Sequence, residues 1–487
     1  MPKVAIIGAG LAGSLLSIYL AKRSIEVDVY EARGDMRLEE VAAGRSINLA
    51  LSDRGIAALR EVGMDEYMLA EAVPMYGRMI HTVSGETKLL PYSGRQGEYI
   101  NSVSRAGLNV ALMNEAEKYD SVTFHFNERC VGFDCESGVA KFSSGVSVSA
   151  DTVIATDGAG SAVRLAMEEQ IEGHVSNTVF LDHGYKELHI PPAADGGFQI
   201  EKNALHIWPR HQFMMIALPN FDGSFTCTLF LAHRSGNVSG SEGALEANGE
   251  SGTLPTGRVS GTKDVPMLRS ATAAFDSLTD EASVRAFFER EFADAVRMMP
   301  TLVEDFFENP TGNLGTLKCW PWNVGGRALL LGDSAHAVVP FYGQGMNCAF
   351  EDVRVLAGLI DRGMSEPGAI ATGSSINWKA IYEEYGKLRK VNTDAIADMA
   401  EENFYEMRDR VADPVFQRKR ELETKLEQTY PDYFSKYSMV TFREDLPYSV
   451  AKAKGNAQDA LLMDLCSTVE SVAELDLDSV VERIKSL

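Results

Sequence analysis

The sequence predicts a mixed α/β protein in which a parallel-sheet domain is interleaved with an antiparallel sheet and followed by a helical C-terminal region. Residues 3–31 pass from strand to glycine turn to helix to strand, the order of a parallel βαβ unit. From His183 to Leu231, short runs of alternating apolar and polar residues are typical of antiparallel strands. Residues 378–404 carry a long helical pattern. A chain of 487 residues with these patterns is expected to form two or three lobes.

A glycine-rich turn follows the first strand. The strand Lys3–Ile7 leads into Gly8-Ala9-Gly10-Leu11-Ala12-Gly13, then into an apolar helix from Ser14 to Arg23 and a strand from Glu26 to Tyr30 that ends at Glu31. This is G-x-G-x-x-G between two strands, with an acid after the second, which is the order of a dinucleotide-binding site.

Each of the three glycines in this turn has a physical task. Gly8 permits the tight turn, Gly10 lets a pyrophosphate approach the backbone and the helix N-terminus, and Gly13 lets helix and strand pack closely. Glu31 would bind a ribose hydroxyl, and it disfavours NADP at this site because a 2′-phosphate would meet its carboxylate. NAD and FAD both remain possible.

A late stretch, residues 329–352, discriminates between these two cofactors. Its apolar strand turns at Gly332, so that Asp333 would reach the ribityl chain of an FAD. Residues 158–163 lack a third glycine, so a nicotinamide cofactor would have no nucleotide domain of its own. An ordinary strand-turn-helix with a satisfied core His336 is the alternative interpretation of the late stretch.

The same stretch offers a smooth surface for a flat ring. Pro340 and Phe341 predict a stiff apolar wall, and the loop Gly343-Gln344-Gly345 has little side-chain bulk before a helix that begins near Met346. The positive end of that helix favours negative charge on the ring, which a reduced flavin carries. The sequence therefore predicts a flavin site here.

Composition excludes some classes of function. A formal charge of −23 and a pI near 4.9 disfavour nucleic acid as a partner. The six cysteines form no C-x-x-C pair or Cys/His cluster, so we expect neither a metal site nor a disulfide framework. With no export signal or membrane span visible, we expect a cytoplasmic protein without a membrane anchor.

Three blocks of sequence resemble a known family. GRSINLALSDRG, GRMIH and GDSAHAVVPFYGQGMNCAFED are similar to the flavin-dependent aromatic hydroxylases (class A FAD monooxygenases), and most of all to their kynurenine-hydroxylating branch, from Lys3 to about Phe442. The resemblance implies bound FAD, NADPH as co-substrate, O₂, and hydroxylation of L-kynurenine to 3-hydroxykynurenine through a C4a-hydroperoxyflavin. The alternatives are a same-fold hydroxylase of another aromatic acid or phenol, a non-catalytic flavin-binding protein, and an NAD-dependent dehydrogenase.

The resemblance also implies the site residues. Substrate contacts fall at Arg78 and Tyr92, which hold the α-carboxylate, and at Asn403 and Tyr437; a guanidinium suits a carboxylate because it binds through two parallel bonds. The residues expected at the reacting face of the flavin are Pro340, Phe341 and Gly345. Cofactor contacts are expected at Gly8, Gly10, Leu11, Ala12, Gly13, Glu31, Arg45, Arg105, Cys130, Asp157, Asp333, Gly345, Met346 and Asn347.

For two of these residues the sequence leaves a choice. Arg45 either holds a phosphate or is simply solvated, and Asp157 either serves FAD and the passing NADPH or caps a helix. Ser102 to Arg105 is expected to open a helix that runs through Tyr119. The expected organisation is a discontinuous FAD-binding domain (1–72, 98–177 and 267–370), a substrate-binding sheet domain (73–97 and 178–266, with a flexible Gly/Ser-rich insertion at 235–263), and a C-terminal helical region (371–487).

Overall fold

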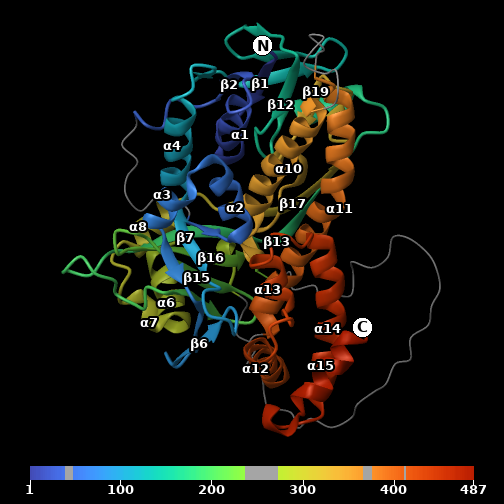
Figure 1. Cartoon of the computed structure of the whole chain (residues 1–487). Helices are drawn as coiled ribbons and strands as arrows, with labels where there is room; N and C mark the ends of the chain where they lie inside the picture. Colours follow the sequence, from blue (N-terminus) through green and yellow to red (C-terminus); the bar gives the residue numbers. More distant parts are fainter. Residues whose placement is uncertain (39–47, 236–272, 366–375, 411–412) are drawn as a thin grey trace.

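The computed structural model describes residues 1–38, 48–235, 273–365, 376–410 and 413–487. Arg45 and almost all of the predicted insertion, residues 236–263, lie outside the described residues. The chain forms an upper part around a mostly parallel sheet and a lower part around an antiparallel sheet and the C-terminal helices (Figure 1). The predicted mixed α/β fold with a helical C-terminal region is confirmed.

A six-stranded sheet with the order β18-β19-β12-β1-β2-β8 forms the upper part. Ile7 at the end of β1 is level with Ala155 at the end of β12, which is level with Leu330 at the end of β19. Because these three strands run parallel, the turns that follow them meet at one edge of the sheet. The bounds of the six strands are β1 Lys3–Ile7, β2 Glu26–Tyr30, β8 Val122–His125, β12 Thr152–Ala155, β18 Asn323–Val324 and β19 Ala328–Leu330.

Two long helices pack against the first helix beside this sheet. The first helix, α1 (Leu11–Ala21), contacts both α4 (Arg105–Ala116) and α10 (Gly345–Ser365). From Gly13 to Ala21 every residue of α1 is buried, which explains its nearly unbroken apolar sequence. Further helices here are α2 Asp53–Val62, α3 Asp65–Ala70, α5 Ala162–Gln170 and α9 Asp333–His336, and a small sheet is formed by β9 Cys130–Asp134, β10 Val139–Phe142 and β11 Ser147–Val148.

One sequence expectation is wrong. Residues 100–104 form strand β7 (Ile100–Ser104), and the helix predicted to open at Ser102 begins only at Arg105. The strand is held by partners far away in sequence, β3 (Asn48–Leu51) and β4 (Val73–Met75), on its two sides. Ser104 then caps the helix, because its hydroxyl accepts a hydrogen bond from the Gly107 amide (3.2 Å).

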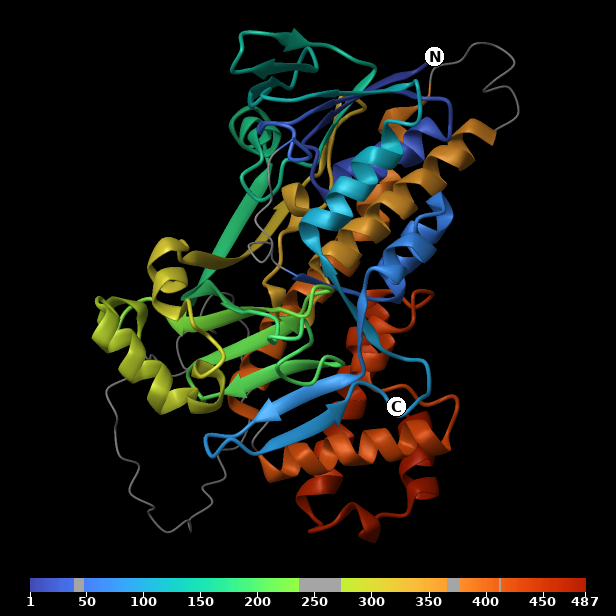
Figure 2. The same cartoon turned by 90° about the vertical axis from the view of Figure 1, so that its left-hand side faces the viewer.

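A seven-stranded sheet with the order β17-β13-β16-β15-β14-β5-β6 forms the lower part, and all its pairs are antiparallel except β14 with β5. Its longest strand, β13, has 16 residues and extends from the upper to the lower part (Figure 2). Helices α6 (Glu281–Glu291), α7 (Ala293–Val296) and α8 (Leu302–Glu308) cover one face through a phenylalanine-rich core. The strands are β5 Gly77–His81, β6 Thr87–Pro91, β13 Val175–Ile190, β14 Ala204–Pro209, β15 Met214–Pro219, β16 Phe225–Ala232 and β17 Gly312–Trp320.

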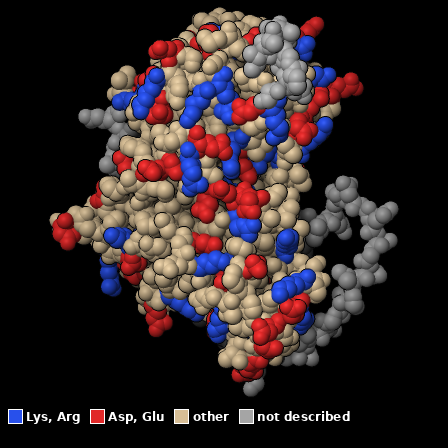
Figure 3. All heavy atoms as spheres, viewed as in Figure 1, with Lys and Arg blue, Asp and Glu red and all other residues tan. Residues whose placement is uncertain are grey.

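The other face of this sheet packs against the C-terminal helices. Helix α11 (Trp378–Tyr405) runs from the upper part to the lower and ends in a π-helical turn, Glu406–Arg410 (Figure 1). The remaining helices are α12 Pro414–Thr429, α13 Lys436–Thr441, α14 Tyr448–Ser467 and α15 Leu477–Lys485. Within the described part of the chain, none of the helices combines the length and apolarity needed to cross a membrane. Acidic and basic side chains are interspersed over the face in Figure 3.

Candidate active site

The turn after β1 is packed solid on its inner side and open on its outer side. A Cβ atom on Gly8, whose φ is +102°, would lie 2.6 Å from the Thr156 carbonyl oxygen, and one on Gly13 would lie 2.1 Å from the Gly8 oxygen. Apart from its chain neighbours, a Cβ atom on Gly10 would meet no atom of the described residues within 4 Å. In the part of the chain that the structure describes, no side chain caps the start of α1, so its first backbone N–H groups face this open space, an arrangement that suits a diphosphate.

Glu31 lies beside this turn as an ionised acceptor. Its carboxylate accepts hydrogen bonds from the Ala9 amide (2.9 Å), the Arg33 amide (3.0 Å) and the Arg33 Nε (2.7 Å). Burial alone would raise the pKa of Glu31, but these donors hold it below its usual value. The remaining lone pairs of its two oxygens are suited to ribose hydroxyls.

Cys130 lies at the same end of the sheet. The preceding Glu128 amide donates to the Glu31 carbonyl oxygen (2.8 Å), which brings the start of β9 beside the predicted ribose position. Burial raises the pKa of the Cys130 thiol to about 11, so the thiol is neutral and its expected contact with a cofactor is not that of a thiolate.

The bend after β19 adjoins the opening turn. A Cβ atom on Gly332 (φ +62°) would lie 3.6 Å from Cβ of Ala12 in the first turn of α1. Asp333 is deep in the molecule, so desolvation raises its pKa, yet the residue keeps exposed surface. Asp333 thus combines a desolvated carboxyl group with surface that is accessible at the edge where the strands end. Arg105, at the start of α4, is near enough to oppose the rise in the Asp333 pKa.

The glycine bend before α10 is held rigidly in place. Asn347 donates to the carbonyl oxygens of Ala50 (2.7 Å) and Gly343 (2.8 Å), and its own oxygen accepts from the Ser52 amide (3.0 Å). Gln344 accepts a hydrogen bond from the Tyr448 hydroxyl (3.0 Å). The sequence predicted a loop with little side-chain bulk. In the structure, the two polar side chains of this bend, Gln344 and Asn347, both point into the protein, where they form hydrogen bonds.

The apolar wall precedes this bend in a short 3₁₀ helix, Pro340–Tyr342. Phe341 is buried between the rings of Phe230 (4.9 Å) and Phe404 (4.5 Å), whereas Pro340 is exposed. Gly345 and Met346, in the first turn of α10, are half-buried. The wall therefore has a fixed inner side and an accessible outer one.

Asp157 follows β12, the strand between β1 and β19. One carboxylate oxygen accepts from the Ala162 amide at the start of α5 (2.8 Å), and the other accepts from the Ser334 hydroxyl (3.0 Å). One of the two interpretations of Asp157 was that it caps a helix. Asp157 does bind an amide at the start of α5, although the capping residue itself is Ser161. Its contact with a cofactor stays a prediction.

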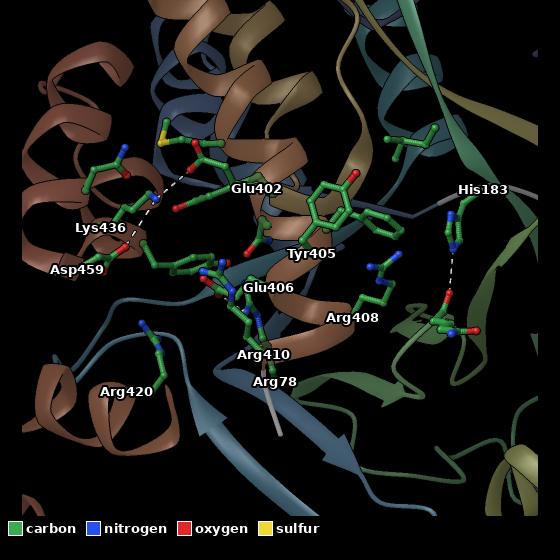
Figure 4. A pocket seen from close by; sticks show the side chains of 18 of the residues that line it. Arg78, His183, Glu402, Tyr405, Glu406, Arg408, Arg410, Arg420, Lys436 and Asp459 are labelled. Carbon is green, nitrogen blue, oxygen red and sulfur yellow. Dashed lines mark hydrogen bonds and ion pairs between the residues drawn. The ribbon is translucent and has the colours of Figure 1, made fainter. Parts of the chain in front are cut away.

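A cavity of about 770 Å³ lies between the seven-stranded sheet, the end of α11 and the C-terminal helices (Figure 4). Its lining includes Arg78, Asn403 and Tyr437, three of the four predicted substrate residues. The fourth, Tyr92, is buried behind Tyr437, with the two rings stacked at 5.2 Å. The Arg78 guanidinium lies 5.1 Å from the Tyr437 ring and 6.0 Å from the Tyr92 ring.

Asn403 connects this cavity to the flavin wall. The residue is in the last turn of α11, and its amide nitrogen donates to the Phe341 carbonyl oxygen (2.6 Å). The position of the wall therefore depends on the helix that also lines the substrate cavity.

Sequence reasoning missed Glu406. This residue begins the π-helical turn after α11, and its carboxylate lies 3.8 Å from Nη1 of Arg78 (Figure 4). An arginine and a glutamate facing one cavity suit the two charged groups of an α-amino acid. Glu406 is in the segment NFYEMR, but the helical pattern gave no sign of the π turn that directs it to the cavity.

The cavity is richer in basic side chains than the chain as a whole. Its lining has seven Lys or Arg and five Asp or Glu, whereas the whole chain has 46 Lys or Arg and 69 Asp or Glu. The cavity therefore favours an anionic group relative to the rest of the surface.

His336 is a buried core histidine whose ring is hydrogen-bonded, which is the role that the alternative interpretation of residues 329–352 gave it. Its Nε2 lies 2.6 Å from a carboxylate oxygen of Asp352, and both side chains are buried. Within the described residues these two form, with Cys348, a group that could in geometric terms ligate a metal. Arg389 already supplies the cation there, because its Nε donates to the other Asp352 oxygen (2.6 Å). The cluster is therefore complete without a metal.

Comparisons with known proteins agree with this arrangement. The family model described as "FAD binding domain" matches residues 1–201 and 293–364. The chain is 42% identical to a kynurenine 3-monooxygenase of Myxococcus xanthus, covering 99% of this chain and 95% of that protein. It is also 42% identical to one of Stenotrophomonas maltophilia, covering 97% and 94%.

A solved structure supports the fold. The tetrameric form of 2-methyl-3-hydroxypyridine-5-carboxylic acid oxygenase superposes with a TM-score of 0.60 at 17% identity, covering 87% of this chain and 97% of that one. On the sequence relationships and the shared FAD-binding fold, the chain belongs to the kynurenine 3-monooxygenase family of FAD-dependent aromatic hydroxylases.

Proposed function

We propose that the protein hydroxylates L-kynurenine at the ring 3-position, with FAD as its bound cofactor and NADPH and O₂ as co-substrates. The observation that carries the proposal is the hydrogen bond from Asn403 to the Phe341 carbonyl, because it joins the cavity that Arg78 lines to the wall of the glycine bend. The family membership of the chain supports the same conclusion.

The residues at the strand edge fit FAD. The open space above Gly10 suits a diphosphate, Glu31 suits ribose hydroxyls, and Asp333, which is exposed at the bend after β19, suits the hydroxyls of a ribityl chain. When bound, FAD accepts a hydride from NADPH and activates O₂ for transfer to an aromatic ring. The N-terminus of α10 at Gly345 favours the negative charge of the reduced ring.

The charged end of the substrate is held at Arg78. Its guanidinium can bind the α-carboxylate through two parallel hydrogen bonds. Burial raises the pKa values of Tyr92 and Tyr437, so both phenols stay protonated at neutral pH and remain hydrogen-bond donors. Glu406, opposite Arg78, then accepts from the α-ammonium group.

The aromatic end needs orientation rather than a strong base. In kynurenine the aniline nitrogen already donates electrons to the neighbouring ring carbon, so no proton must be removed before attack. The Phe341 ring packs against Phe404 (4.5 Å) and Phe230 (4.9 Å), and all three rings are buried, so water is excluded from this side of the bend. A dry, oriented site raises the fraction of activated oxygen that reaches the substrate.

Three finer assignments complete the proposal. We keep the predicted division into an FAD-binding domain (1–72, 98–177 and 267–370), a substrate-binding sheet domain (73–97 and 178–266) and a C-terminal helical region (371–487) as part of the proposal. The protein acts in the cytoplasm, which is supported by six cysteines that are all free. Cofactor contacts at Arg45, Arg105 and Cys130 remain part of the proposal.

NADPH consumption distinguishes this function from its rivals. L-Kynurenine is expected to stimulate NADPH oxidation by the FAD-loaded protein at least tenfold, and 4-hydroxybenzoate is not. Stimulation by 4-hydroxybenzoate alone would point to a phenol hydroxylase. Flavin that NADPH fails to reduce with any aromatic ligand would point to a non-catalytic flavoprotein, and a purified protein without flavin to a dehydrogenase.

A further inference from the structure

The cofactor bend and the substrate cavity are joined by a buried arginine, Arg54, in the first turn of α2. Its side chain has no exposed surface. Its Nε donates to the Val440 carbonyl (2.8 Å), one terminal nitrogen donates to the carbonyls of Arg443 (2.9 Å) and Leu446, and the other pairs with Glu351 (2.9 Å). A guanidinium buried this completely holds its surroundings to one geometry, because every displaced partner leaves a charge unpaired.

The backbone that carries Arg54 is fixed to the flavin bend. The Ser52 amide and the Ala50 carbonyl, just before α2, are both bonded to the side chain of Asn347 in the first turn of α10. Gly55 lies so close that a Cβ atom there would be 2.4 Å from the Asn347 oxygen. The position of Arg54 therefore follows that of the helix that begins at the glycine bend.

The far end of the Arg54 side chain fixes helix α13, which carries Tyr437. This six-residue helix is held at its start by Glu427, which accepts from the Ser435 amide (2.9 Å) and the Ser438 hydroxyl (2.6 Å). At its end, Arg54 binds the Val440 carbonyl, where a positive charge also complements the helix dipole. Tyr437 lies one turn before Val440, so Arg54 sets its position relative to the bend.

A second link runs from the same guanidinium to the bend itself. Arg54 lies 4.0 Å from the ring centre of Tyr448, whose hydroxyl donates to Gln344 between the two glycines. Glu351 continues the network on the other side, because it also pairs with Arg389 (2.8 Å), which binds Asp352. The buried charges thus connect α2, α10, α11 and the segment after α13.

We propose that Arg54 is a positioning residue that couples occupancy of the substrate cavity to the geometry of the flavin bend. The inference rests on the proposed hydroxylase function, since it concerns how the substrate is kept in register with the flavin. If the Arg54 guanidinium cannot bind Val440, Arg443 and Glu351 at the same time, helix α13 is no longer held at a fixed distance from the bend. Tyr437, which lies on this helix, then moves relative to the flavin bend. Substrate then binds more weakly and more of the activated oxygen escapes as H₂O₂, while FAD, held at the other end of the slot, is retained.

Arg54→Lys in the full FAD-loaded protein tests this role. Lysine keeps the positive charge but cannot reach Val440, Arg443 and Glu351 together. The Kd for L-kynurenine, read from the flavin absorbance, is expected to rise at least tenfold and the H₂O₂ formed per NADPH at least twofold, with FAD affinity within twofold of wild type. Arg60→Lys is the matched control, because Arg60 is on the same helix in an exposed ion pair with Asp65 (3.2 Å), and no change is expected there.

Two results would overturn the proposal. If Arg54→Lys keeps the wild-type L-kynurenine affinity and H₂O₂ yield, Arg54 does not couple the two sites. If FAD affinity and L-kynurenine affinity fall in parallel, Arg54 only stabilises the fold. Wild-type protein that does not turn over L-kynurenine would instead contradict the proposed function, so the two failures are distinguishable.

Tyr448→Phe decides the question if Arg54→Lys does not fold. This change removes only the hydroxyl that donates to Gln344, and we expect a twofold or larger rise in H₂O₂ per NADPH with FAD retained. Combined with Tyr437→Phe, the effects on kcat/KM should be non-additive, because both residues act through one network. An unchanged H₂O₂ yield together with strict additivity would contradict the coupling.

Discussion

Gly10→Ala separates cofactor binding from folding in the opening turn. Apart from its chain neighbours, a methyl group at this position would have no atom of the described residues within 4 Å, so the substitution creates no clash with this part of the folded chain. The methyl group would instead stand where the diphosphate must approach the backbone. We expect a folded protein that has lost most of its affinity for FAD.

The magnitude follows from the hydrogen bonds at stake. Hydrogen bonds to charged groups contribute about 1.5–3 kcal/mol each, so the loss of one bond to phosphate weakens FAD binding by about 10- to 150-fold, and the loss of two weakens it by about 150-fold or more. The cost to folding is the change from glycine to alanine at a helix N-cap, roughly 0.5–1 kcal/mol. Gly13→Ala should differ sharply, because its methyl group would lie 2.1 Å from the Gly8 oxygen and the turn itself would have to move.

The assay is titration of apoprotein with FAD, followed by flavin fluorescence, alongside thermal unfolding of the apoprotein. Gly358→Ala is the matched control, since a methyl group there also meets nothing within 4 Å but lies within α10, away from the bend. It should leave FAD affinity unchanged. If Gly10→Ala binds FAD as tightly as wild type, the diphosphate is not bound at this turn.

Three further changes test the remaining assignments. Arg78→Met should raise KM for L-kynurenine about 100-fold, the effect of about 3 kcal/mol of lost charged hydrogen bonds, with FAD retained; equal loss of FAD would argue against a carboxylate clamp. Asn403→Leu frees the Phe341 carbonyl, so kcat/KM should fall about tenfold and H₂O₂ per NADPH should rise; an unchanged H₂O₂ yield would show that Asn403 does not fix the wall. Burial, together with the nearby Glu444 and Glu98, raises the pKa of Asp53 to about 6. The folded state therefore binds this proton more tightly than the unfolded state does. As a result, the free energy of unfolding decreases as the pH rises from about 4 to 6. Asp53→Asn should therefore raise the free energy of unfolding by roughly 1–2 kcal/mol at pH 7.5, allowing for partial solvent screening, and not at pH 3; urea denaturation at both pH values checks the sign.

Local patterns in the sequence were sufficient for the cofactor edge. The order of strand, glycine turn, helix, strand and acid lies within residues 3–31 and admits few structures, although Gly8 and Gly13 also pack closely against the distant Thr156. The late bend was predictable for the same reason, because Gly332 and Gly343, both with positive φ, mark its two turns.

Features that depend on distant partners were not predictable in the same way. Residues 102–104 were predicted to open a helix, yet they belong to strand β7 because β3 and β4 pair with both of its edges. Glu406 and Arg54 acquire their roles only when α11, α2 and α13 come together. A single sequence does not distinguish a buried arginine from a solvated one. The link between the bend and Tyr437 could therefore be recognised only from the tertiary structure.

Isotope-labelled turnover bears on the proposed hydroxylation without any substitution in the chain. Purified FAD-loaded protein is incubated with NADPH, L-kynurenine and ¹⁸O₂, and the product is identified by mass spectrometry against authentic standards. We expect 3-hydroxykynurenine with one ¹⁸O atom in its ring hydroxyl, formed in near-stoichiometric proportion to NADPH consumed. Unlabelled product, hydroxylation at another ring carbon, or H₂O₂ with unchanged L-kynurenine would contradict the proposed function.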